Sequence, residues 1–154
     1  MHKLLISICM ILLGCLHVSA QQNTFRQTGV ASYYSTKFEG RKTASGEKFT
    51  NNGYTAAHNR LKFGTYVKVI NTRTGKWVVV KINDKLHQRN KRIVDLTRRA
   101  AKQLGLMSHG VTKVRLEIVP KAEGQEWIAA QMKYITPNHK AEEAALKSKK
   151  KARK

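Results

Sequence analysis

Two neighbouring segments of the chain, residues 65–71 and 76–82, repeat an apolar side chain at every second position. The residues expected to face inward are Val67, Val69, Val78, Val80 and Ile82. A period of two is typical of a β-strand with one buried face. Between the segments, residues 72–75 read Thr-Arg-Thr-Gly, and a four-residue turn that ends in glycine suits a longer hairpin connection. The sequence therefore predicts a β-hairpin, around which the remaining elements have to be arranged.

The other predicted elements are short and come at hairpin spacing. Strands are expected over residues 29–34, 93–96 and 111–119, and a short helix over residues 97–104. Thr97 fits the N-cap of this helix, and Gly105 fits its C-terminal stop. Short strands with little helix predict a mainly β fold, either a small barrel or a sandwich with one inserted helix.

Residues 1–20 have the features of a signal peptide. Lys3 precedes an apolar core, and Val18-Ser19-Ala20 supplies a small-residue cleavage site. An alternative is a lipid-modified Cys15, because Leu12-Leu13-Gly14-Cys15 resembles the bacterial lipoprotein box. The bulky Leu13 favours ordinary cleavage after Ala20. In both cases we expect export to the periplasm or cell envelope.

Both cysteines, Cys9 and Cys15, lie in this signal segment. Cleavage after Ala20 leaves a mature chain without a thiol, which excludes disulfides, zinc–thiolate sites and cysteine nucleophiles. Residues 21–28 are polar and are expected to form a leader, and residues 29–120 are expected to form one domain.

The chain carries 30 Lys and Arg residues against 9 Asp and Glu residues, a formal net charge of +21, and the signal peptide removes only Lys3 of these. Such an excess predicts an anionic partner. For an exported protein the candidates are peptidoglycan, other anionic envelope polymers and phospholipid headgroups. Residues 121–154 are expected to form a basic, partly disordered tail that could tether the protein to such polymers. Its candidate packing residues are Trp127, Ile128, Met132 and Ile135.

Asp84 stands at the end of the second hairpin strand, and the polar residues 85–92 after it are typical of a loop. Strand ends and loops are where a rigid scaffold presents chemistry. The only other aspartate in the sequence is Asp95. Taken alone, the Asn83-Asp84 pair favours a turn-capping role over catalysis.

Three further residues are candidates, and each has an ordinary structural interpretation. Glu47 ends a small-residue loop and, taken alone, is best read as a solvated loop residue. His58 follows small residues with no second histidine or acid at metal spacing, so it is expected to be a hydrogen-bonded structural residue, and neither a metal nor another cofactor is expected. Asp95 precedes the predicted helix, where free backbone amides stabilise a carboxylate.

A resemblance rests on several motifs taken in order. They are GVASYY (residues 29–34), FEGRKTASGE (38–47), YTAAH (54–58), GTYVKVINTRTGKWVVVKIND (64–84) and IVDLTRRAAKQLG (93–105). In this order they resemble the rare lipoprotein A family of bacterial septal-ring lytic transglycosylases, over roughly residues 29–119. Several spaced motifs are far more specific than any one of them alone.

The resemblance implies a six-stranded double-psi β-barrel, a fold that the family shares with expansins. It also implies cleavage of peptidoglycan glycan strands between N-acetylmuramic acid and N-acetylglucosamine, in wall remodelling or septation. The catalytic aspartate of the family falls on Asp84 and the matched glutamate on Glu47, with His58 and Asp95 in supporting positions. Where the family has Arg-Gly-Pro after the catalytic aspartate, this chain has Lys85-Leu86-His87. Lys85 is therefore expected to border the glycan.

The implied reaction needs only one carboxyl group at the reacting atoms. The C6 hydroxyl of muramic acid attacks its own anomeric carbon and gives a 1,6-anhydro product, whereas glycosidases generally use two carboxylates. Asp84 can protonate the leaving oxygen and then accept the C6 proton. Glu47 is expected in the same groove, either orienting the sugar or acting on Asp84 as a like charge.

Two other functions remain open at this stage. The protein can bind and loosen the wall without cutting it, as expansins do. It can also be a cationic protein that binds nucleic acid or lipopolysaccharide nonspecifically, which explains the charge but not the ordered motifs. We expect no specific nucleic-acid partner, and a monomer that acts on peptidoglycan glycan strands.

Overall fold

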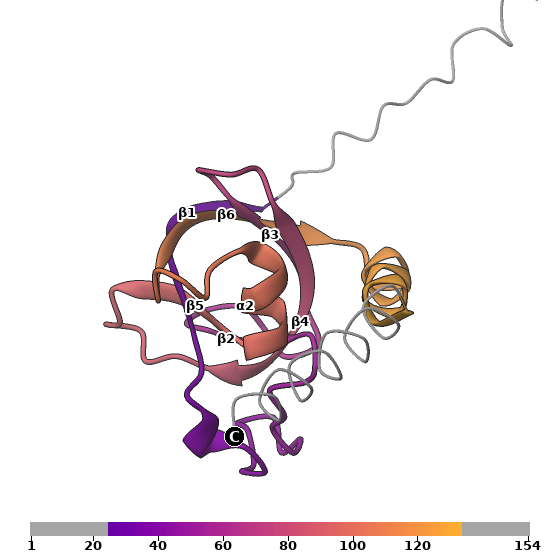
Figure 1. Ribbon diagram of the computed structural model, residues 1–154. Helices are drawn as coiled ribbons and strands as arrows, with labels where there is room; N and C mark the ends of the chain where they lie inside the picture. Colours follow the sequence, from indigo (N-terminus) through magenta and orange to yellow (C-terminus); the bar gives the residue numbers. More distant parts are fainter. Residues whose placement is uncertain (1–24, 134–154) are drawn as a thin grey trace, which may run out of the picture.

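Six strands close into a barrel in the computed structural model, which describes residues 25–133 of the chain (Figure 1). In chain order they are β1 (Arg26–Tyr33), β2 (Thr55–His58), β3 (Tyr66–Asn71), β4 (Trp77–Lys85), β5 (Arg92–Leu96) and β6 (Thr112–Val119). Around the barrel the order is β1-β5-β2-β4-β3-β6, and β6 returns to β1. The pairs β1–β5 and β2–β4 are parallel. The predicted mainly β, six-stranded barrel is confirmed.

The predicted hairpin is confirmed as β3 and β4, which pair antiparallel from Tyr66 opposite Lys81 to Ile70 opposite Trp77. The glycine of its turn, Gly75, has a φ of 70°, a left-handed conformation in which a Cβ would be strained. The inward-facing valines and Ile82 are all fully buried. Burial of an aliphatic side chain of this size contributes about 1.5–3 kcal/mol. The hairpin therefore supplies a large part of the core.

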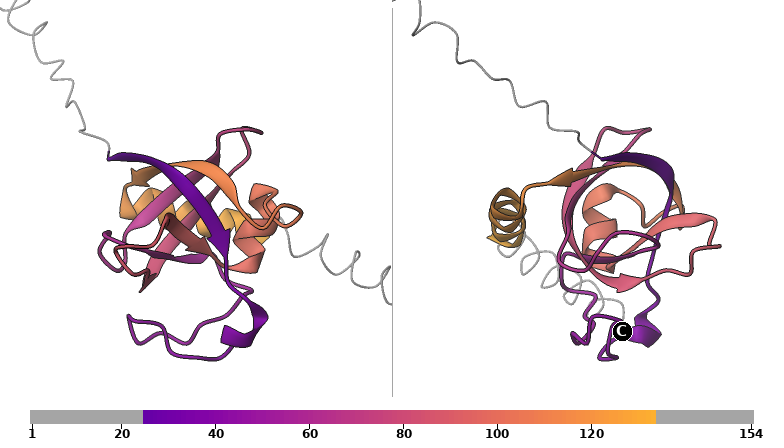
Figure 2. Two further views of the ribbon diagram at one scale, coloured as in Figure 1. Left: turned by 90° about the vertical axis from the view of Figure 1, so that its left-hand side faces the viewer. Right: turned by 180° about the vertical axis from the view of Figure 1, so that it is seen from behind.

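Helix α2 (Arg98–Leu104) lies across one end of the barrel (Figures 1 and 2). Its buried residues are Ala100, Ala101 and Leu104. Gly105 ends the helix as predicted, with a φ of 75°. Thr97 occupies the N-cap position, but its hydroxyl donates to the Gly53 carbonyl at 2.6 Å instead of capping the helix. Thr97 therefore connects the start of α2 to the loop before β2, and its side chain does not cap the helix.

The barrel begins earlier than the sequence pattern predicts. Residues 26–28 belong to β1 and lie opposite residues 115–117 of β6. The last three residues of the predicted leader, 21–28, are therefore strand. Their side chains are mostly exposed, because this end of β1 is defined by backbone pairing and not by a buried face.

Residues 121–133 are helical, and this C-terminal helix packs on the outside of the barrel beside β4 (Figures 1 and 2). Trp127 meets Trp77 edge-on, with ring centroids 4.9 Å apart. Ile128 packs against the core. Residues 121–133 of the predicted tail therefore pack on the domain, through two of the candidate packing residues, Trp127 and Ile128.

Gln131 of this helix takes the place of a strand beside β4. β2 begins at Thr55, opposite Lys81, so Val79 extends past the end of β2. The Gln131 amide supplies both partners there: the Val79 N–H donates to Oε1 at 2.8 Å, and Nε2 donates to the Val79 carbonyl at 2.9 Å. Since unpaired buried backbone groups cost free energy, this contact fixes the helix to the barrel.

Some sequence predictions lie outside the described residues. These are the signal peptide over residues 1–20, the alternative modification of Cys15, and the tail beyond residue 133. Within residues 25–133, the helices lack the length and apolar character needed to cross a membrane.

Candidate active site

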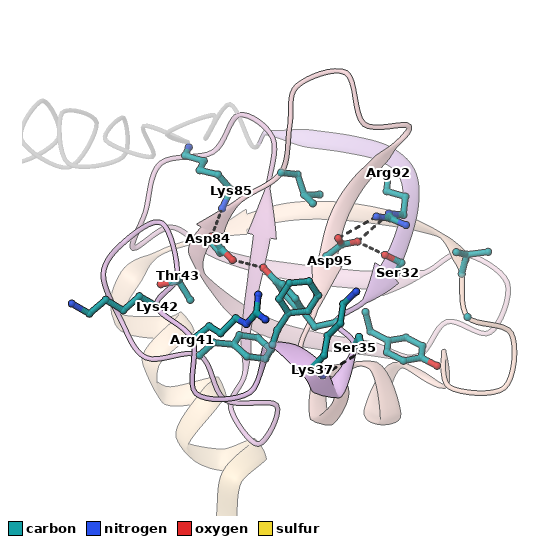
Figure 3. A pocket seen from close by; sticks show the side chains of 17 residues that line it. Ser32, Ser35, Lys37, Arg41, Lys42, Thr43, Asp84, Lys85, Arg92 and Asp95 are labelled. Carbon is teal, nitrogen blue, oxygen red and sulfur yellow. Dashed lines mark hydrogen bonds and ion pairs between the residues drawn. The ribbon is translucent and has the colours of Figure 1, made fainter.

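Asp84 lies near the end of β4, where the pairing of that strand with β2 is irregular. Ala56 pairs with Ile82 and Ala57 pairs with Asp84, which leaves Asn83 as an extra residue on β4. Such a bulge bends a strand and changes the direction of the side chains that follow. The Asp84 side chain lines a cleft (Figure 3).

Both oxygens of the Asp84 carboxylate accept hydrogen bonds. Oδ2 accepts from the hydroxyl of Tyr34 at 2.6 Å. Oδ1 accepts from the backbone N–H groups of Ala44 and Lys85, each at 2.9 Å. The donors come from separate segments of the chain, so the orientation of this carboxylate is fixed by the fold itself.

Tyr34 follows β1, and its backbone N–H donates to the Leu96 carbonyl at 2.9 Å. Its ring packs between Phe49, with centroids 4.5 Å apart, and Phe38, at 5.8 Å. Burial raises the pKa of Tyr34, and the hydrogen bond to Asp84 raises it further. The phenol therefore keeps its proton and remains a donor to Asp84.

The cleft in front of Asp84 has a volume of about 740 Å³ and combines aromatic walls with a basic rim (Figure 3). The aromatic residues are Tyr33, Tyr34, Phe38 and Phe49, and the basic residues are Lys37, Arg41, Lys42, Lys85 and Arg92. Aromatic rings offer flat apolar surfaces against which a sugar ring can lie. A cationic rim attracts an anionic polymer. The cleft is therefore suited to a negatively charged glycan.

Asp95 lines the same cleft as Asp84, although it comes from β5 (Figure 3). Its carboxylate accepts a hydrogen bond from the Ser32 hydroxyl on the paired strand β1. The Nε of Arg92 lies 3.2 Å from its Oδ1. Backbone amides at the start of α2 were expected to stabilise Asp95. In the structure, the Ser32 hydroxyl and the Arg92 guanidinium do so inside the cleft.

Glu47 is directed to the neighbouring residues of β4. Its carboxylate pairs with the Lys81 ammonium at 2.6 Å and accepts from the Asn83 side-chain amide at 3.0 Å. These hydrogen bonds from Lys81 and Asn83 lower the pKa of Glu47. Among the described residues, those lining the Asp84 cleft do not include Glu47. The loop that contains Glu47 reaches Asp84 through the backbone N–H of Ala44, whereas the Glu47 carboxylate lies outside the cleft.

His58 is fully buried at the end of β2. Its Nδ1 accepts the backbone N–H groups of Arg60 and Leu61, both at 3.0 Å, and Nε2 lies 3.1 Å from Gln27 Oε1. The proton is therefore on Nε2. Burial, with smaller effects of Lys85 and Arg60, lowers the pKa of His58 to about 4. A neutral imidazole that organises the turn after β2 agrees with the structural interpretation.

Lys85 lies beside Asp84 and lines the cleft. Its ammonium donates to the Leu61 carbonyl at 2.7 Å and lies 4.9 Å from the centre of the Phe63 ring. This arrangement directs the charge away from the Asp84 carboxylate. Within residues 25–133, no group of three or more His, Cys, Asp or Glu side chains is placed to hold a metal ion.

Sequence reasoning did not single out Tyr34, Ser32 or Arg92. Tyr34 and Ser32 belong to the GVASYY motif, yet a strand motif does not indicate which side chain points to a distant carboxylate. Tyr34 and Ser32 meet Asp84 and Asp95 only when the barrel closes, whereas Arg92 lies three residues before Asp95 on the same strand.

A family model described as lytic transglycolase, of the double-psi β-barrel (DPBB) type, matches residues 26–116, more than half of the chain. The barrel and its cleft thus define a double-psi β-barrel protein of the lytic transglycolase class. Curated relatives at 38% and 44% identity are both named RlpA. The chain belongs to the rare lipoprotein A (RlpA) family.

Two of these relatives illustrate the match. The endolytic peptidoglycan transglycosylase RlpA of Haemophilus influenzae is 38% identical over 125 residues, which cover 81% of this chain and 44% of that protein. The protein of the same name from Neisseria meningitidis serogroup A is 44% identical over 112 residues, covering 72% of this chain and 46% of that protein. The chain spans less than half the length of these relatives.

Solved structures agree on the fold. An expansin from Clavibacter michiganensis superposes with a TM-score of 0.50 at 21% identity, over 62% of this chain and 51% of that chain. The Streptomyces papain inhibitor superposes with a TM-score of 0.51 at 20% identity, over 62% of this chain and 96% of that chain. At such identities the likeness concerns the fold alone.

Proposed function

We propose that this protein is a peptidoglycan lytic transglycosylase. It cleaves the glycan bond between N-acetylmuramic acid and N-acetylglucosamine and forms 1,6-anhydro-N-acetylmuramic acid. The observation that carries the proposal is the Asp84 carboxylate, which is held by Tyr34 and by backbone amides at the wall of an aromatic and basic cleft. The name of the relatives, endolytic peptidoglycan transglycosylase, supports the same reaction.

Asp84 acts first as an acid and then as a base. Its carboxyl proton passes to the glycosidic oxygen as the bond from that oxygen to C1 of muramic acid breaks, and the N-acetylglucosamine end leaves. The C6 hydroxyl of the same muramic acid then attacks C1, and its proton returns to Asp84. No water takes part, so one carboxyl group suffices where hydrolysis requires two.

The other site residues have positioning and binding roles in this proposal. Tyr34 keeps the Asp84 carboxylate in one orientation by its 2.6 Å hydrogen bond. Asp95 and Lys85 border the cleft and bind polar groups of the glycan. Glu47 and His58 have indirect roles. Glu47 accepts a hydrogen bond from Asn83 and so holds the loop whose Ala44 N–H donates to Asp84. His58 accepts the N–H of Leu61 and so orders the turn whose Leu61 carbonyl accepts from Lys85.

The test is digestion of purified sacculi by the protein and by Asp84→Asn, with the soluble products read by mass spectrometry. Anhydromuramyl products from the wild type alone support the proposal. If both proteins released equal amounts of product, the catalytic group would be a residue other than Asp84. Absence of products from both, with the protein still bound to sacculi, would favour the alternative of an expansin-like wall-binding protein.

The proposed substrate requires a location outside the cytoplasm. We infer export to the periplasm or cell envelope through residues 1–20, and action as a monomer. The basic end of the sequence, residues 140–154, adds an electrostatic tether to anionic envelope polymers. Such a tether predicts binding to sacculi that weakens with rising salt and that is reduced when these lysines are replaced.

A further inference from the structure

Two positive charges lie over one aromatic ring in the wall of the Asp84 cleft. The Lys37 ammonium is 5.3 Å from the centre of the Phe38 ring, and the Arg41 guanidinium carbon is 5.5 Å from it. All three residues line the cleft (Figure 3). Cations are attracted to the face of an aromatic ring at such distances. The ring therefore gathers both charges at one place in the cleft, and we call Lys37 and Arg41 the cation pair.

The cation pair has no carboxylate partner in the part of the chain that the structure describes. The ion pairs within residues 25–133 involve neither Lys37 nor Arg41. The one acidic residue of the segment 35–46 is Glu39, and its carboxylate accepts the backbone N–H of Asn51 at 2.8 Å. Since like charges repel, two cations over one ring favour an anion beside them. Ammonium and guanidinium groups both donate strong hydrogen bonds to a carboxylate.

The segment that carries the cation pair is preformed. Lys37 belongs to a short 3-10 helix, η1 (Thr36–Phe38). The backbone N–H of Arg41 donates to the Phe38 carbonyl at 3.1 Å, and the N–H of Phe49 donates to the Arg41 carbonyl at 2.7 Å. Backbone hydrogen bonds thus position both side chains without a ligand.

The cation pair is linked to Asp84 through two aromatic rings. Phe38 meets the Tyr34 ring edge-on, with centroids 5.8 Å apart, and the Tyr34 hydroxyl donates to Asp84 at 2.6 Å. A sugar that lies along these rings with its C1 at Asp84 can reach the cation pair with a substituent on another ring carbon. In muramic acid that substituent is the lactyl ether on C3, which ends in a carboxyl group.

We propose that Lys37 and Arg41 bind the lactyl carboxylate of the muramic acid that reacts at Asp84. The inference rests on the proposed function and assigns the residues that choose between the two alternating sugars of the strand. Both sugars carry a C6 hydroxyl, so ring closure alone does not distinguish them. Only muramic acid carries a lactyl group, and its carboxylate on the cation pair places the C1 of muramic acid, and not that of N-acetylglucosamine, at Asp84.

The test compares two ligands by NMR titration of the protein: N-acetylglucosaminyl-anhydro-N-acetylmuramic acid and the neutral N-methylamide of its lactyl group. In both, the anhydro sugar is the one that has reacted. We expect the acid to bind more tightly than the amide, by roughly three- to tenfold. Lys37→Gln/Arg41→Gln should lower the affinity for the acid to that for the amide and leave the amide unchanged.

Two further variants serve as controls. Lys37→Arg/Arg41→Lys keeps both charges and should retain most of the preference for the acid. Arg73→Gln/Lys76→Gln removes two charges from the exposed turn at the other end of β4 and is expected to change neither affinity. With peptide-free glycan strands as substrate, Lys37→Gln/Arg41→Gln should raise KM and leave kcat little changed, because a contact made equally before and during the reaction is lost.

Equal affinities of the wild type for acid and amide, or binding of neither, would overturn the inference, as would an equal loss in the Arg73→Gln/Lys76→Gln control. Displacement of the acid by acetate at similar concentration would overturn it in favour of a general anion site. Digestion of sacculi by the wild type separates this result from the proposed function. If no anhydro products are released the proposed function fails, whereas the binding comparison still decides the role of the cation pair.

Discussion

The hydroxyl of Tyr34 donates a 2.6 Å hydrogen bond to Oδ2 of Asp84. Tyr34 follows β1 and Asp84 lies on β4, two strands that do not neighbour each other in the barrel. The contact therefore joins separate parts of the barrel mouth. Burial raises the pKa of Tyr34, so at neutral pH the phenol keeps the proton that it donates to Asp84.

Tyr34→Phe is expected to lower the rate of sacculus digestion by roughly 10- to 100-fold, because a hydrogen bond to a charged group is worth about 1.5–3 kcal/mol. Substrate binding should change little, since the aromatic ring remains in the cleft wall. Release of anhydro products, measured over time at several sacculus concentrations, separates turnover from binding. Tyr33→Phe is the control, because Tyr33 lines the same cleft. Full activity of Tyr34→Phe would remove Tyr34 from the mechanism.

Glu47→Ala is expected to reduce turnover about tenfold while changing the free energy of unfolding by less than about 1 kcal/mol. The carboxylate joins the loop of residues 43–47 to Lys81 and Asn83, and that loop delivers the Ala44 N–H to Asp84. Glu47→Gln, which retains an acceptor for Asn83, should fall between the wild type and Glu47→Ala. If Glu47→Gln were as inactive as Asp84→Asn, Glu47 would have a direct chemical role and the positioning role would be wrong.

Acidification is expected to destabilise the fold through His58. Its pKa is lowered to about 4 from an ordinary value of 6.5, so the unfolded chain takes up the proton first as the pH falls. The contribution of His58 is complete above pH 6.5 and declines toward pH 4, by about 2 kcal/mol between pH 7.5 and 5. Urea unfolding at the two pH values measures it. His58→Gln should flatten this pH dependence, whereas the exposed His109→Gln should leave it unchanged.

Gln131→Ala is expected to lower the free energy of unfolding by about 2–4 kcal/mol, because it leaves the N–H and carbonyl of Val79 without their partners. Chemical denaturation followed by tryptophan fluorescence suits the measurement, since Trp127 and Trp77 lie at this interface. Gln125→Ala, at an exposed position of the same helix, should cost less than about 0.5 kcal/mol. Similar losses for both variants would mean that helix propensity, and not the Val79 contact, holds the helix.

The hairpin, the end of α2 at Gly105 and the place of Asp84 at a strand end were predictable because each follows from residues close together in the chain. Periodicity and glycine placement report local backbone structure directly. The same reasoning missed the first residues of β1, where pairing with β6 and not a buried face defines the strand.

The hydrogen-bond partners of Asp84 and Asp95 could not be predicted from local sequence patterns. Tyr34 and Asp84 are 50 residues apart, and Ser32 and Asp95 are 63 residues apart. Their contacts exist only after the barrel has closed. Glu47 was expected to share the groove with Asp84, but the direction of its side chain depends on Lys81 and Asn83, which no local pattern indicates.

The side-chain amide of Gln131 also occupies backbone groups of β4 that could otherwise pair with a strand of another molecule. A barrel resists strand-to-strand association because it has no free edge, but β4 extends past its partner β2 at Val79, where Gln131 supplies the hydrogen-bond partners in place of a strand. Without the helix of residues 121–133, that stretch becomes a template for a strand from another molecule. We therefore expect a shortened domain ending at Pro120 to form intermolecular sheet and aggregate, which would give the C-terminal helix a role against aggregation as well as in stability.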